Sequence, residues 1–480
     1  MRTNTKTLDA AQRHQADTPL GPVEYRFPCT PGQQSLWFLD RLSPGNPAFH
    51  IAVRLRMEGA LNPLLLERAI NGVVERHEIL RTTFLSVDGE PVQAVHNTAS
   101  VPLPCDDLSG LNEWERRFQE EARTIREARI PFDLRVGPLI RARLLCLAPQ
   151  EHVLLLTMHH IVSDGWSIGV FSDEVSQIYA SLAQGLSPSL PPLPIQYADY
   201  AVWQRSRADA GSLERDRAYW RRKLACLPAC EIPADFPRPR HRTHNAYILS
   251  ELLPIELTDE LMRFAAAHQC TMHTACLAAL KMLIAHHLGQ PDVYVGSLFA
   301  GRERVELEPL IGLFVDTFVL RTDLSGDPTA AELLHRVKDT LNEALAHRAL
   351  HFQGIVEAVR PARDPARPVL YSINFIYQRD FVKPLEFAGL TMAPMPSKSP
   401  GAIYDLNFFM VRRSDGWRLS CEYNTDLYEP ETISRLLCEL RGLFQEIPLH
   451  PQQRLSQFRY AADAPEPLPD FVPRRKPFAS

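Results

Sequence analysis

The chain has 480 residues, more than the roughly 250 to 300 at which single hydrophobic cores stop growing, so two lobes or domains are expected. Its formal net charge is −5 and it has no long basic run, which argues against nucleic acid as a partner. Hydrophobic residues make up 45% of the chain, as in ordinary globular proteins, and no apolar segment is long enough to cross a bilayer, which argues against a membrane protein.

The N-terminus and the cysteines indicate the compartment. Residues 1–26 are polar and lack the apolar core of a secretory signal, so we expect a flexible segment and a cytoplasmic protein. The nine cysteines are scattered. The closest pairs, Cys226 with Cys230 and Cys270 with Cys276, lack CxxC spacing. Free thiols are therefore expected, and a metal site is not.

Patterns of apolar and polar residues predict helices and strands over the first half of the chain. Capping residues and first-turn prolines mark helix starts, and alternation marks half-buried strands. In chain order, the expected elements are a helix from Thr30, a strand over 49–57, a helix from Asn62, strands over 139–147 and 153–158, and a helix over 168–182. The stiff proline-rich stretch 187–194 ends this N-terminal lobe, which is expected over 27–190.

The second half of the chain repeats this mixture. A linker helix over 197–224 precedes a C-terminal lobe, and the two together are expected over 191–462. The expected helices of the lobe cover 258–268, 274–287 and 430–444, and its expected strands cover 248–253, 293–296, 314–321, 370–377, 404–411 and 417–423, the last two as a hairpin. The predicted fold class is therefore α/β, with two lobes.

The stretch Met158–Ser167 carries the candidate chemistry. A buried strand leads to two adjacent histidines, His159 and His160, and Asp164 and Gly165 follow in the turn before a helix. A neutral imidazole can accept a proton near pH 7. Because successive side chains of a strand point to opposite faces, only one of the two histidines is expected to reach a substrate.

A second candidate is Arg81, where a charged helix end changes to a strand-like segment. A buried carboxylate needs a cation or several hydrogen-bond donors, so we expect Arg81 to pair with Asp164. Another histidine pair, His286 and His287, lacks an aspartate at the matching distance. These two residues are expected at the end of a helix.

Together these motifs resemble those of the condensation domains of nonribosomal peptide synthetases. Met158–Ser167 contains the HHxxxDG pattern of the active site of that family, and the resemblance extends from about 27 to 458. Other similar segments are 30–39, 76–84, 197–203 and 311–317. The resemblance implies two α/β sandwich lobes similar to chloramphenicol acetyltransferase, arranged as a V-shaped pseudodimer with a tunnel between them.

The resemblance also implies roles and partners. The reacting histidine would be His160, and the supporting residues would be His159, Asp164, Gly165, Arg81 and Trp203. The implied enzyme is an acyltransferase of nonribosomal peptide or polyketide biosynthesis, the chemistry that makes many antibiotics. It would transfer an acyl or peptidyl chain from the phosphopantetheine of a donor carrier protein to an amine or alcohol, which gives an amide or an ester. The acceptor would be a small molecule or be held on a second carrier, and no bound cofactor or metal is expected.

Some segments of the second lobe depart from the family pattern. Asp316 stands where asparagine is usual, 347–352 replaces a motif with a Gln-Asp pair, 363–370 keeps part of the next motif, and Ile376 stands where many members have asparagine. Because the resemblance assigns this lobe to the acceptor side, we expect an unusual acceptor.

We recognise no adenylation or carrier segment in the sequence, so we expect a free-standing enzyme that meets its carriers in trans, with chain release as a candidate step. The proline-rich tail 463–480 is a candidate docking motif, since short apolar and basic segments often bind partners. The residues that we single out in it are Phe471, Arg474, Arg475 and Lys476.

Three alternatives stay open. The first is an HHxxxDG acyltransferase that uses acyl-CoA, against which the close match of 76–84 and 197–203 argues. The second is an epimerisation or heterocyclisation domain of the same superfamily. Heterocyclisation domains replace the histidines with aspartates, whereas this chain keeps both, and second-lobe motifs of epimerisation are not found. The third is a non-catalytic module that recruits carrier proteins, against which the intact His159, His160 and Asp164 argue.

Overall fold

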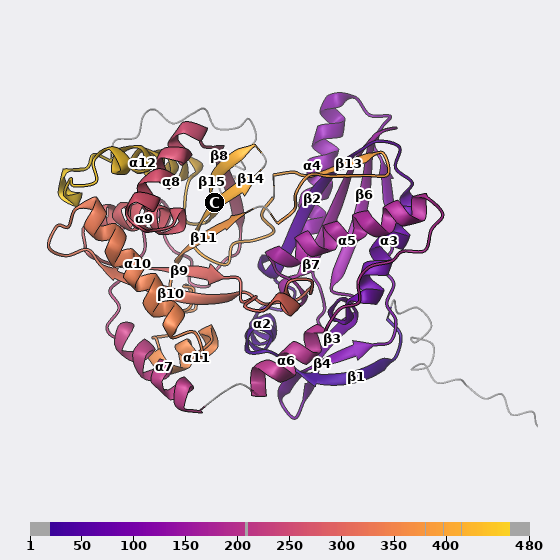
Figure 1. Ribbon diagram of the computed structural model, residues 1–480, viewed down its shortest axis with the longest axis horizontal. Coiled ribbons are helices and arrows are strands. Elements are labelled where there is room, and N and C mark those ends of the chain that lie inside the picture. The colour runs from indigo at the N-terminus through magenta and orange to yellow at the C-terminus, as the bar shows by residue number, and fades with distance from the viewer. Residues whose placement is uncertain (1–19, 207–209, 380, 397, 414, 461–480) are drawn as a thin grey trace, which may run out of the picture.

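The computed structural model describes residues 20–206, 210–379, 381–396, 398–413 and 415–460. Within these residues the chain forms two lobes, each built on a six-stranded sheet. Figure 1 shows the lobes side by side, the N-terminal lobe mostly in indigo and magenta and the C-terminal lobe mostly in rose, orange and yellow. The predicted α/β class and the two lobes are confirmed.

The N-terminal lobe is built around strand β7, which ends at the two histidines. Its sheet has the order β12-β13-β2-β7-β6-β5. The strands are β2 (His50–Glu58), β5 (Cys105–Asp107), β6 (Ile140–Ala148), β7 (Glu151–His159), β12 (Leu385–Phe387) and β13 (Leu390–Pro394). Leu154 and Leu156 share a core with helices α3 (Pro63–Arg76) and α5 (Gly165–Ala183). On the opposite face, Leu155 lies on the side of α4 (Glu113–Arg129). Helices thus cover both faces of β7.

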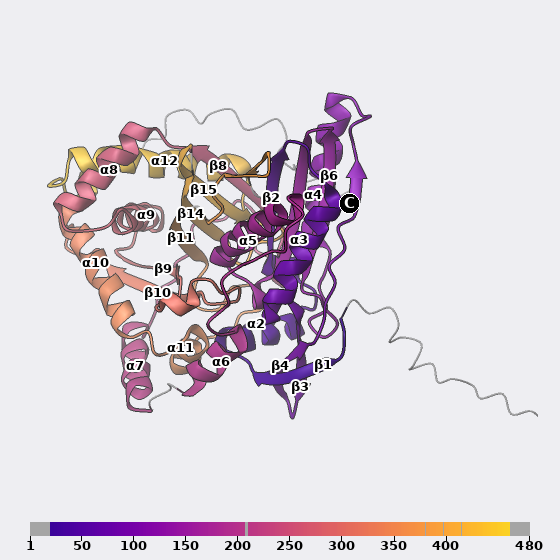
Figure 2. The same ribbon diagram turned by 45° about the vertical axis from the view of Figure 1, so that its right-hand side comes forward.

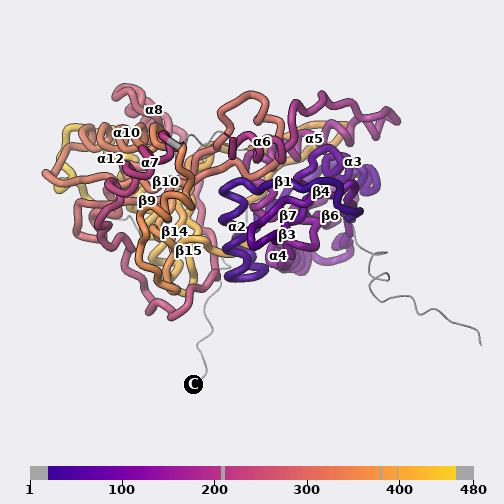
Figure 3. The backbone as a smooth tube through the Cα atoms, turned by 90° about the horizontal axis from the view of Figure 1, so that it is seen from below, coloured from indigo at the N-terminus to yellow at the C-terminus, as the bar shows by residue number. Residues whose placement is uncertain are grey.

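A small sheet flanks this lobe, in the order β1-β4-β3. Its strands are β1 (Val23–Pro28), β3 (Thr82–Val87) and β4 (Glu90–His96). Because β1 pairs with β4, regular structure begins within the segment 1–26 that we expected to be flexible, and that expectation is wrong from Val23 onward. Helix α2 (Pro31–Leu42) follows, capped by Thr30 as predicted, and lies at the junction of the lobes (Figure 3).

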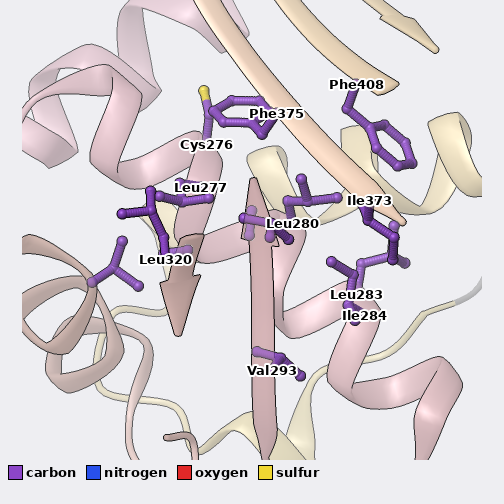
Figure 4. Close-up of a cluster of buried hydrophobic side chains, with 14 of the residues drawn as sticks. Cys276, Leu277, Leu280, Leu283, Ile284, Val293, Leu320, Ile373, Phe375 and Phe408 are labelled. Atoms are coloured by element: carbon purple, nitrogen blue, oxygen red, sulfur yellow. The ribbon is translucent and has the colours of Figure 1, made fainter. Parts of the chain in front are cut away.

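The C-terminal lobe packs helices on one face of its sheet, whose order is β10-β9-β11-β14-β15-β8. The strands are β8 (Ala246–Leu252), β9 (Asp292–Phe299), β10 (Asp316–Asp323), β11 (Ile373–Arg379), β14 (Leu406–Arg413) and β15 (Gly416–Asn424). The helices are α8 (Ile255–Ala267), α9 (Met272–Leu288), α10 (Ala330–Ala346) and α12 (Pro430–Leu449). Figure 4 shows part of the apolar core between α9 and the strands, including Leu277, Leu280 and Phe375. The β14–β15 hairpin and the position of His286 and His287 at a helix end are confirmed.

The chain crosses between the lobes more often than the sequence predicts. Instead of one linker helix there are two, α6 (Tyr197–Ser206) and α7 (Ala210–Lys223). Tyr197 belongs to the N-terminal core and Trp220 to the C-terminal core, so the lobe boundary lies after α6 rather than at 190. Helix α7 packs on α11 (Phe352–Val359). Strands β12 and β13 return from the second half of the chain to extend the N-terminal sheet.

Lys281 on α9 is fully buried, and it predicts a pH dependence of stability. Its Nζ donates to Leu320 O at 2.7 Å and to Thr322 Oγ1 at 2.6 Å, and no carboxylate pairs with it among the described residues. Burial lowers the pKa of Lys281 from 10.5 to about 7. Since the unfolded chain keeps the ordinary pKa, unfolding takes up a proton between about pH 7 and pH 10. Stability should therefore rise with pH in this range, by about 1 kcal/mol per pH unit from this group.

Lys281→Met should remove this contribution. We expect the free energy of unfolding of the wild type, minus that of the variant, to grow as pH rises from 7 to 9. Urea denaturation at pH 7, 8 and 9 measures that difference. A difference that stays constant with pH would show that Lys281 is not deprotonated on folding.

Candidate active site

Strand β7 presents the two histidines in different directions. It ends at His159, the residues His160–Val162 form a short 3-10 helix, and Asp164 caps α5. Hydrogen bonds to β2 and β6 on either side fix the end of β7. His159 is 2% exposed, whereas His160 is half-buried and lines a cavity between the lobes. Of the two, only His160 lines the cavity.

His159 is enclosed by aromatic side chains. Its ring lies 5.8 Å from His50 and 6.2 Å from Phe132, centroid to centroid, and its Nδ1 accepts a hydrogen bond from Ile161 N at 3.1 Å. Burial lowers the pKa of His159 well below its ordinary value, and the neighbouring His50 and His160 lower it further. His159 therefore stays neutral and supports the turn that follows β7.

His160 has the charge state of a base. Burial lowers the pKa of its imidazole below the ordinary 6.5, although the charge of Asp164 partly offsets this effect. The ring is therefore neutral at pH 7, and it can take up a proton from a group in the cavity.

The lowered pKa of His160 predicts the position of the acid limb of activity. With an alcohol acceptor, which does not itself titrate, the acid limb of kcat for acyl transfer should be centred below pH 6.5. The rate falls there because a protonated imidazole cannot accept a proton. Initial rates at saturating substrates between pH 5 and pH 8 measure this profile. A limb centred above pH 6.5 would mean that a different group controls the rate.

Asp164 is fully buried and receives a complete set of donors. Its carboxylate accepts from Ser167 N at 2.9 Å, Ser167 Oγ at 2.7 Å and Phe314 N at 3.1 Å. Arg302 Nη2 adds contacts of 3.1 and 3.4 Å to its two oxygens. With every lone pair directed at a donor, Asp164 is an anchor that joins the histidine loop to the segment around Phe314.

The predicted partner of Asp164 is wrong. Arg81 instead donates to His96 O and contacts Glu78 Oε1 at 3.4 Å. The segment around Arg81 packs against β4 of the small sheet, and this directs its side chain toward that sheet. The sequence therefore assigned the right kind of partner to Asp164 but the wrong arginine.

Arg302 is the residue that sequence reasoning missed. It lies in the loop after β9, and its side chain is 2% exposed. Its guanidinium lies 4.0 Å from the ring centre of Phe314, and it donates to Leu307 O and Leu310 O. Since 138 residues separate it from Asp164, no local pattern could have indicated this pair.

The other predicted residues take different places. Gly165 is the first residue of α5 and lines the cavity, and the ring of Phe381 packs closely on its Cα. Trp203, on α6, packs near Tyr200 with ring centroids 5.9 Å apart, and Arg304 lies 5.6 Å from its ring. It is not among the residues that line the cavity. The tail residues Phe471, Arg474, Arg475 and Lys476 lie outside the described residues, so their docking role stays a prediction.

The cavity has a volume of about 1880 Å³, and both lobes line it. Ligand pockets for small molecules are usually about 300 to 1,000 Å³, so this space accommodates long substrates. Figure 2 shows the C-terminal sheet between its helices and the N-terminal lobe, with its second face toward that lobe. Rows of side chains paired across β14 and β15 line the cavity from this face, namely Asn407 with Glu422, Phe409 with Ser420, and Val411 with Arg418.

No group of three or more histidine, cysteine, aspartate or glutamate side chains with metal-binding geometry occurs in the part of the chain that the structure describes. None of the described helices is long and apolar enough to span a membrane.

Comparison with known proteins decides the family. The family model of the condensation domain matches residues 23–466 of the sequence. The chain belongs to the condensation-domain family. Condensation domains are acyltransferases that form amide bonds in nonribosomal peptide synthesis, and they act on substrates carried by phosphopantetheinylated carrier proteins.

The relatives are large synthetases. The chain is 38% identical over 442 residues to one of the linear gramicidin synthase proteins of Brevibacillus parabrevis, a match that covers 91% of this chain but 6% of that protein. It is 38% identical over 443 residues to phosphinothricin tripeptide synthetase PhsB of Streptomyces viridochromogenes, a match that covers 89% of this chain and 37% of that protein. A solved complex of the X-domain and OxyB from teicoplanin biosynthesis matches with a TM-score of 0.81 and 28% identity, over 92% of this chain and 97% of the matched one. The chain thus spans well under half the length of these curated relatives.

Two departures of this condensation domain from the family motifs meet in space. Asp316 Oδ2 lies 2.5 Å from His351 Nδ1, and Asp316 Oδ1 accepts from Phe352 N at 3.3 Å. His351 Nε2 lies 3.2 Å from Gln204 Nε2 on α6. Although burial lowers the pKa of His351, the hydrogen bond and charge of Asp316 outweigh this and raise it. Both residues line the cavity, so this pair contributes to its wall.

Proposed function

We propose that the chain transfers an acyl or peptidyl group from a carrier-bound phosphopantetheine thioester to an amine or alcohol, with His160 as the general base. The observation that carries this proposal is the position of His160. Its neutral ring is held at the end of a central strand and lines a cavity between two lobes. Gly165, at the start of α5, lines the same cavity.

In the proposed step, the nitrogen or oxygen of the acceptor attacks the thioester carbonyl carbon. His160 takes the proton of the nucleophile as the new bond forms. The carbon–sulfur bond then breaks, and the proton passes to the leaving thiolate, so the products are an amide or ester and the free thiol of the pantetheine arm. An alcohol depends more on the base than an amine that is already neutral, for which positioning contributes more.

The residues around His160 support this chemistry in distinct ways. Asp164 and Arg302 hold the loop that carries His160, and His159 supports the turn from behind. The amide of Gly165 belongs to the first turn of α5, where helix geometry offers it no intrahelical acceptor. We propose this amide as a donor to the developing oxyanion. The enclosing lobes would limit water and so protect the thioester from hydrolysis.

The experiment that tests the proposal uses a carrier protein loaded with an acyl group and supplied as a separate polypeptide, since we also propose delivery in trans. The loaded carrier and the chain are mixed with a panel of amines and alcohols, and intact-protein mass spectrometry follows unloading of the carrier. Formation of the matching amide or ester supports the proposal, and its release from the carrier would support a role in chain release. Transfer from acyl-CoA alone, with the loaded carrier left unchanged, would contradict it.

A second candidate is a recruiting module without catalytic activity. The similarity to the X-domain in complex with OxyB favours it, because that domain is seen bound to a partner protein. The intact His159, His160 and Asp164 argue against it. Tight binding of loaded carrier by the wild type, with no transfer to any acceptor in the panel, would favour recruitment over catalysis.

A further inference from the structure

Arg242 is a charged group on the cavity wall that the proposed transfer leaves unused. It lies in the segment before β8, and its side chain lines the cavity. Among the described residues the side chain makes no hydrogen bond or ion pair, and its Nη2 is shielded from solvent without a partner. The nearby Arg238 differs, because it contacts Asp405 at 2.6 Å and Glu231 at 3.1 Å.

A shielded guanidinium without a counter-charge is costly, since burial disfavours the charged form and nothing repays the loss of water. Burial lowers the pKa of Arg242, and the charge that offsets this most is that of Asp405, which Arg238 already holds. Arginine nevertheless keeps its proton in proteins. The guanidinium of Arg242 therefore lacks an anionic partner. Its planar fork of N–H donors matches the geometry of a carboxylate or a phosphate.

Two anions could enter the cavity, a carboxylate of the acceptor or the phosphate of the pantetheine arm. Glu422, on the same wall, decides between them. It is 9% exposed, it accepts hydrogen bonds from Ser399 Oγ at 2.6 Å and Asn407 Nδ2 at 3.5 Å, and no cation pairs with it in the described part of the chain. Burial raises the pKa of its carboxyl. Thr243 Oγ1, in the residue after Arg242, donates to Asn424 Oδ1 at 3.3 Å, so the segment of Arg242 lies at the end of β15 that carries Glu422. The charges of both Arg242 and Glu422 act on the hydroxyl of Tyr404. A buried carboxyl that lacks a cation is complemented by the positive group of an amino acid, which favours its charged form, whereas a phosphodiester carries negative charge only.

We propose that Arg242 binds the carboxylate of a free amino acid that serves as the acceptor, with Glu422 adding negative charge for a cationic group of the same molecule. This inference rests on the proposed acyl transfer and names its acceptor class. An acceptor held on a carrier has no free carboxylate, because the thioester replaces it. Arg242 therefore favours the soluble form of the acceptor over the carrier-bound form.

The test compares acids with their neutral analogues. The proteinogenic L-amino acids are offered to the chain with a loaded carrier, and the best acceptor is then compared with its carboxamide and its methyl ester. The wild type should prefer the acid by at least about 10-fold in kcat/KM, the energy of a charge-assisted hydrogen bond. Arg242→Gln should raise KM for the acid about 10- to 100-fold. The same variant should change KM for the carboxamide less than about 3-fold. Arg242→Lys should restore part of the preference, since it keeps the charge without the fork.

The matched control is Arg240→Gln, which removes the same charge two residues away from an exposed side chain outside the cavity lining. Arg240→Gln should leave KM unchanged for both the acid and the carboxamide. Equal losses for acid and carboxamide in Arg242→Gln would indicate a structural role and overturn the proposal. So would a loss seen with phosphopantetheine donors but not with pantetheine thioesters, which lack the phosphate.

A binding measurement separates this proposal from the transfer itself. Calorimetric titration of the same amino acids into the chain without donor should show binding that Arg242→Gln weakens about 10-fold or more. Such binding without any product would refute the transfer but keep the subsite. If no amino acid binds, and carrier-bound aminoacyl groups serve equally well in wild type and variant, the Arg242 proposal is wrong even where transfer occurs.

Discussion

His160→Ala is expected to lower kcat for acyl transfer to an alcohol acceptor by about 10²- to 10⁴-fold, the range that a positioned general base supplies. His160 is the histidine of the pair that lines the cavity, and its lowered pKa keeps it neutral at pH 7. Without it, the hydroxyl proton has no acceptor at the place where the oxygen attacks. Initial rates with a loaded carrier protein, at saturating alcohol, measure the loss.

The same variant should lose much less activity with a weakly basic amine, which is neutral and needs little help to attack. This difference separates proton transfer from a loss of shape, because a distorted cavity would slow both acceptors alike. His450→Ala is the control, since His450 is about half exposed at the end of α12. Equal activity of His160→Ala and wild type with the alcohol would remove His160 from the mechanism.

The local structure of the active site could be predicted because it depends on neighbours in sequence. The apolar run before His159 predicts a buried strand, and the three- and four-residue spacing after Gly165 predicts a helix, and both elements are present. As expected, only one of the two histidines reaches the cavity, although His160 belongs to the 3-10 helix after the strand rather than to the strand itself. The family resemblance then rested on motifs of this kind, and the match over 23–466 confirms it.

The contacts that join the two halves of the chain could not be predicted. Arg81 and Arg302 are equally suitable partners for Asp164 by charge, and only the crossing of the loop after β9 into the N-terminal lobe selects Arg302. In the same way, periodicity over 197–224 predicts helix, but it does not reveal that the first part packs on one lobe and the second part on the other. Strands β12 and β13 are short, and the pairing of β13 with β2, which brings β12 into the same sheet, depends on a partner more than 300 residues away.

The pairing of Asp316 with His351 shows how structure relates two separate departures from the family pattern. In sequence, each appeared as an isolated change on the acceptor side. In space, His351 Nδ1 and Asp316 Oδ2 are 2.5 Å apart. Replacing either residue would therefore remove the hydrogen-bond partner of the other. The two residues and Arg242 all line the cavity, so they give its wall a pattern of charge.

Arg302→Met is expected to destabilise the chain by about 3 to 5 kcal/mol, because it leaves the carboxylate of Asp164 buried without its cation. Asp164 is fully buried, and the side chain of Arg302 is 2% exposed, so water cannot replace the lost contact. Arg302 also satisfies Leu307 O and Leu310 O, which hold the segment that passes beneath the histidine loop. The variant should therefore lose transfer activity as well, since His160 is positioned from that loop. Urea denaturation and the carrier assay measure the two effects.

Arg81→Met is the matched control, because it removes the arginine that the sequence alone had favoured. Its side chain is 12% exposed, its pair with Glu78 is long at 3.4 Å, and it donates to His96 O, so the loss of this hydrogen bond should cost about 1 to 3 kcal/mol. Asp164→Asn combined with Arg302→Met should cost less than the sum of the two single changes, by about 1 to 3 kcal/mol, since the double variant leaves no unpaired charge. Additive costs, or a larger cost for Arg81→Met than for Arg302→Met, would mean that the ion pair of Asp164 with Arg302 does not hold the histidine loop.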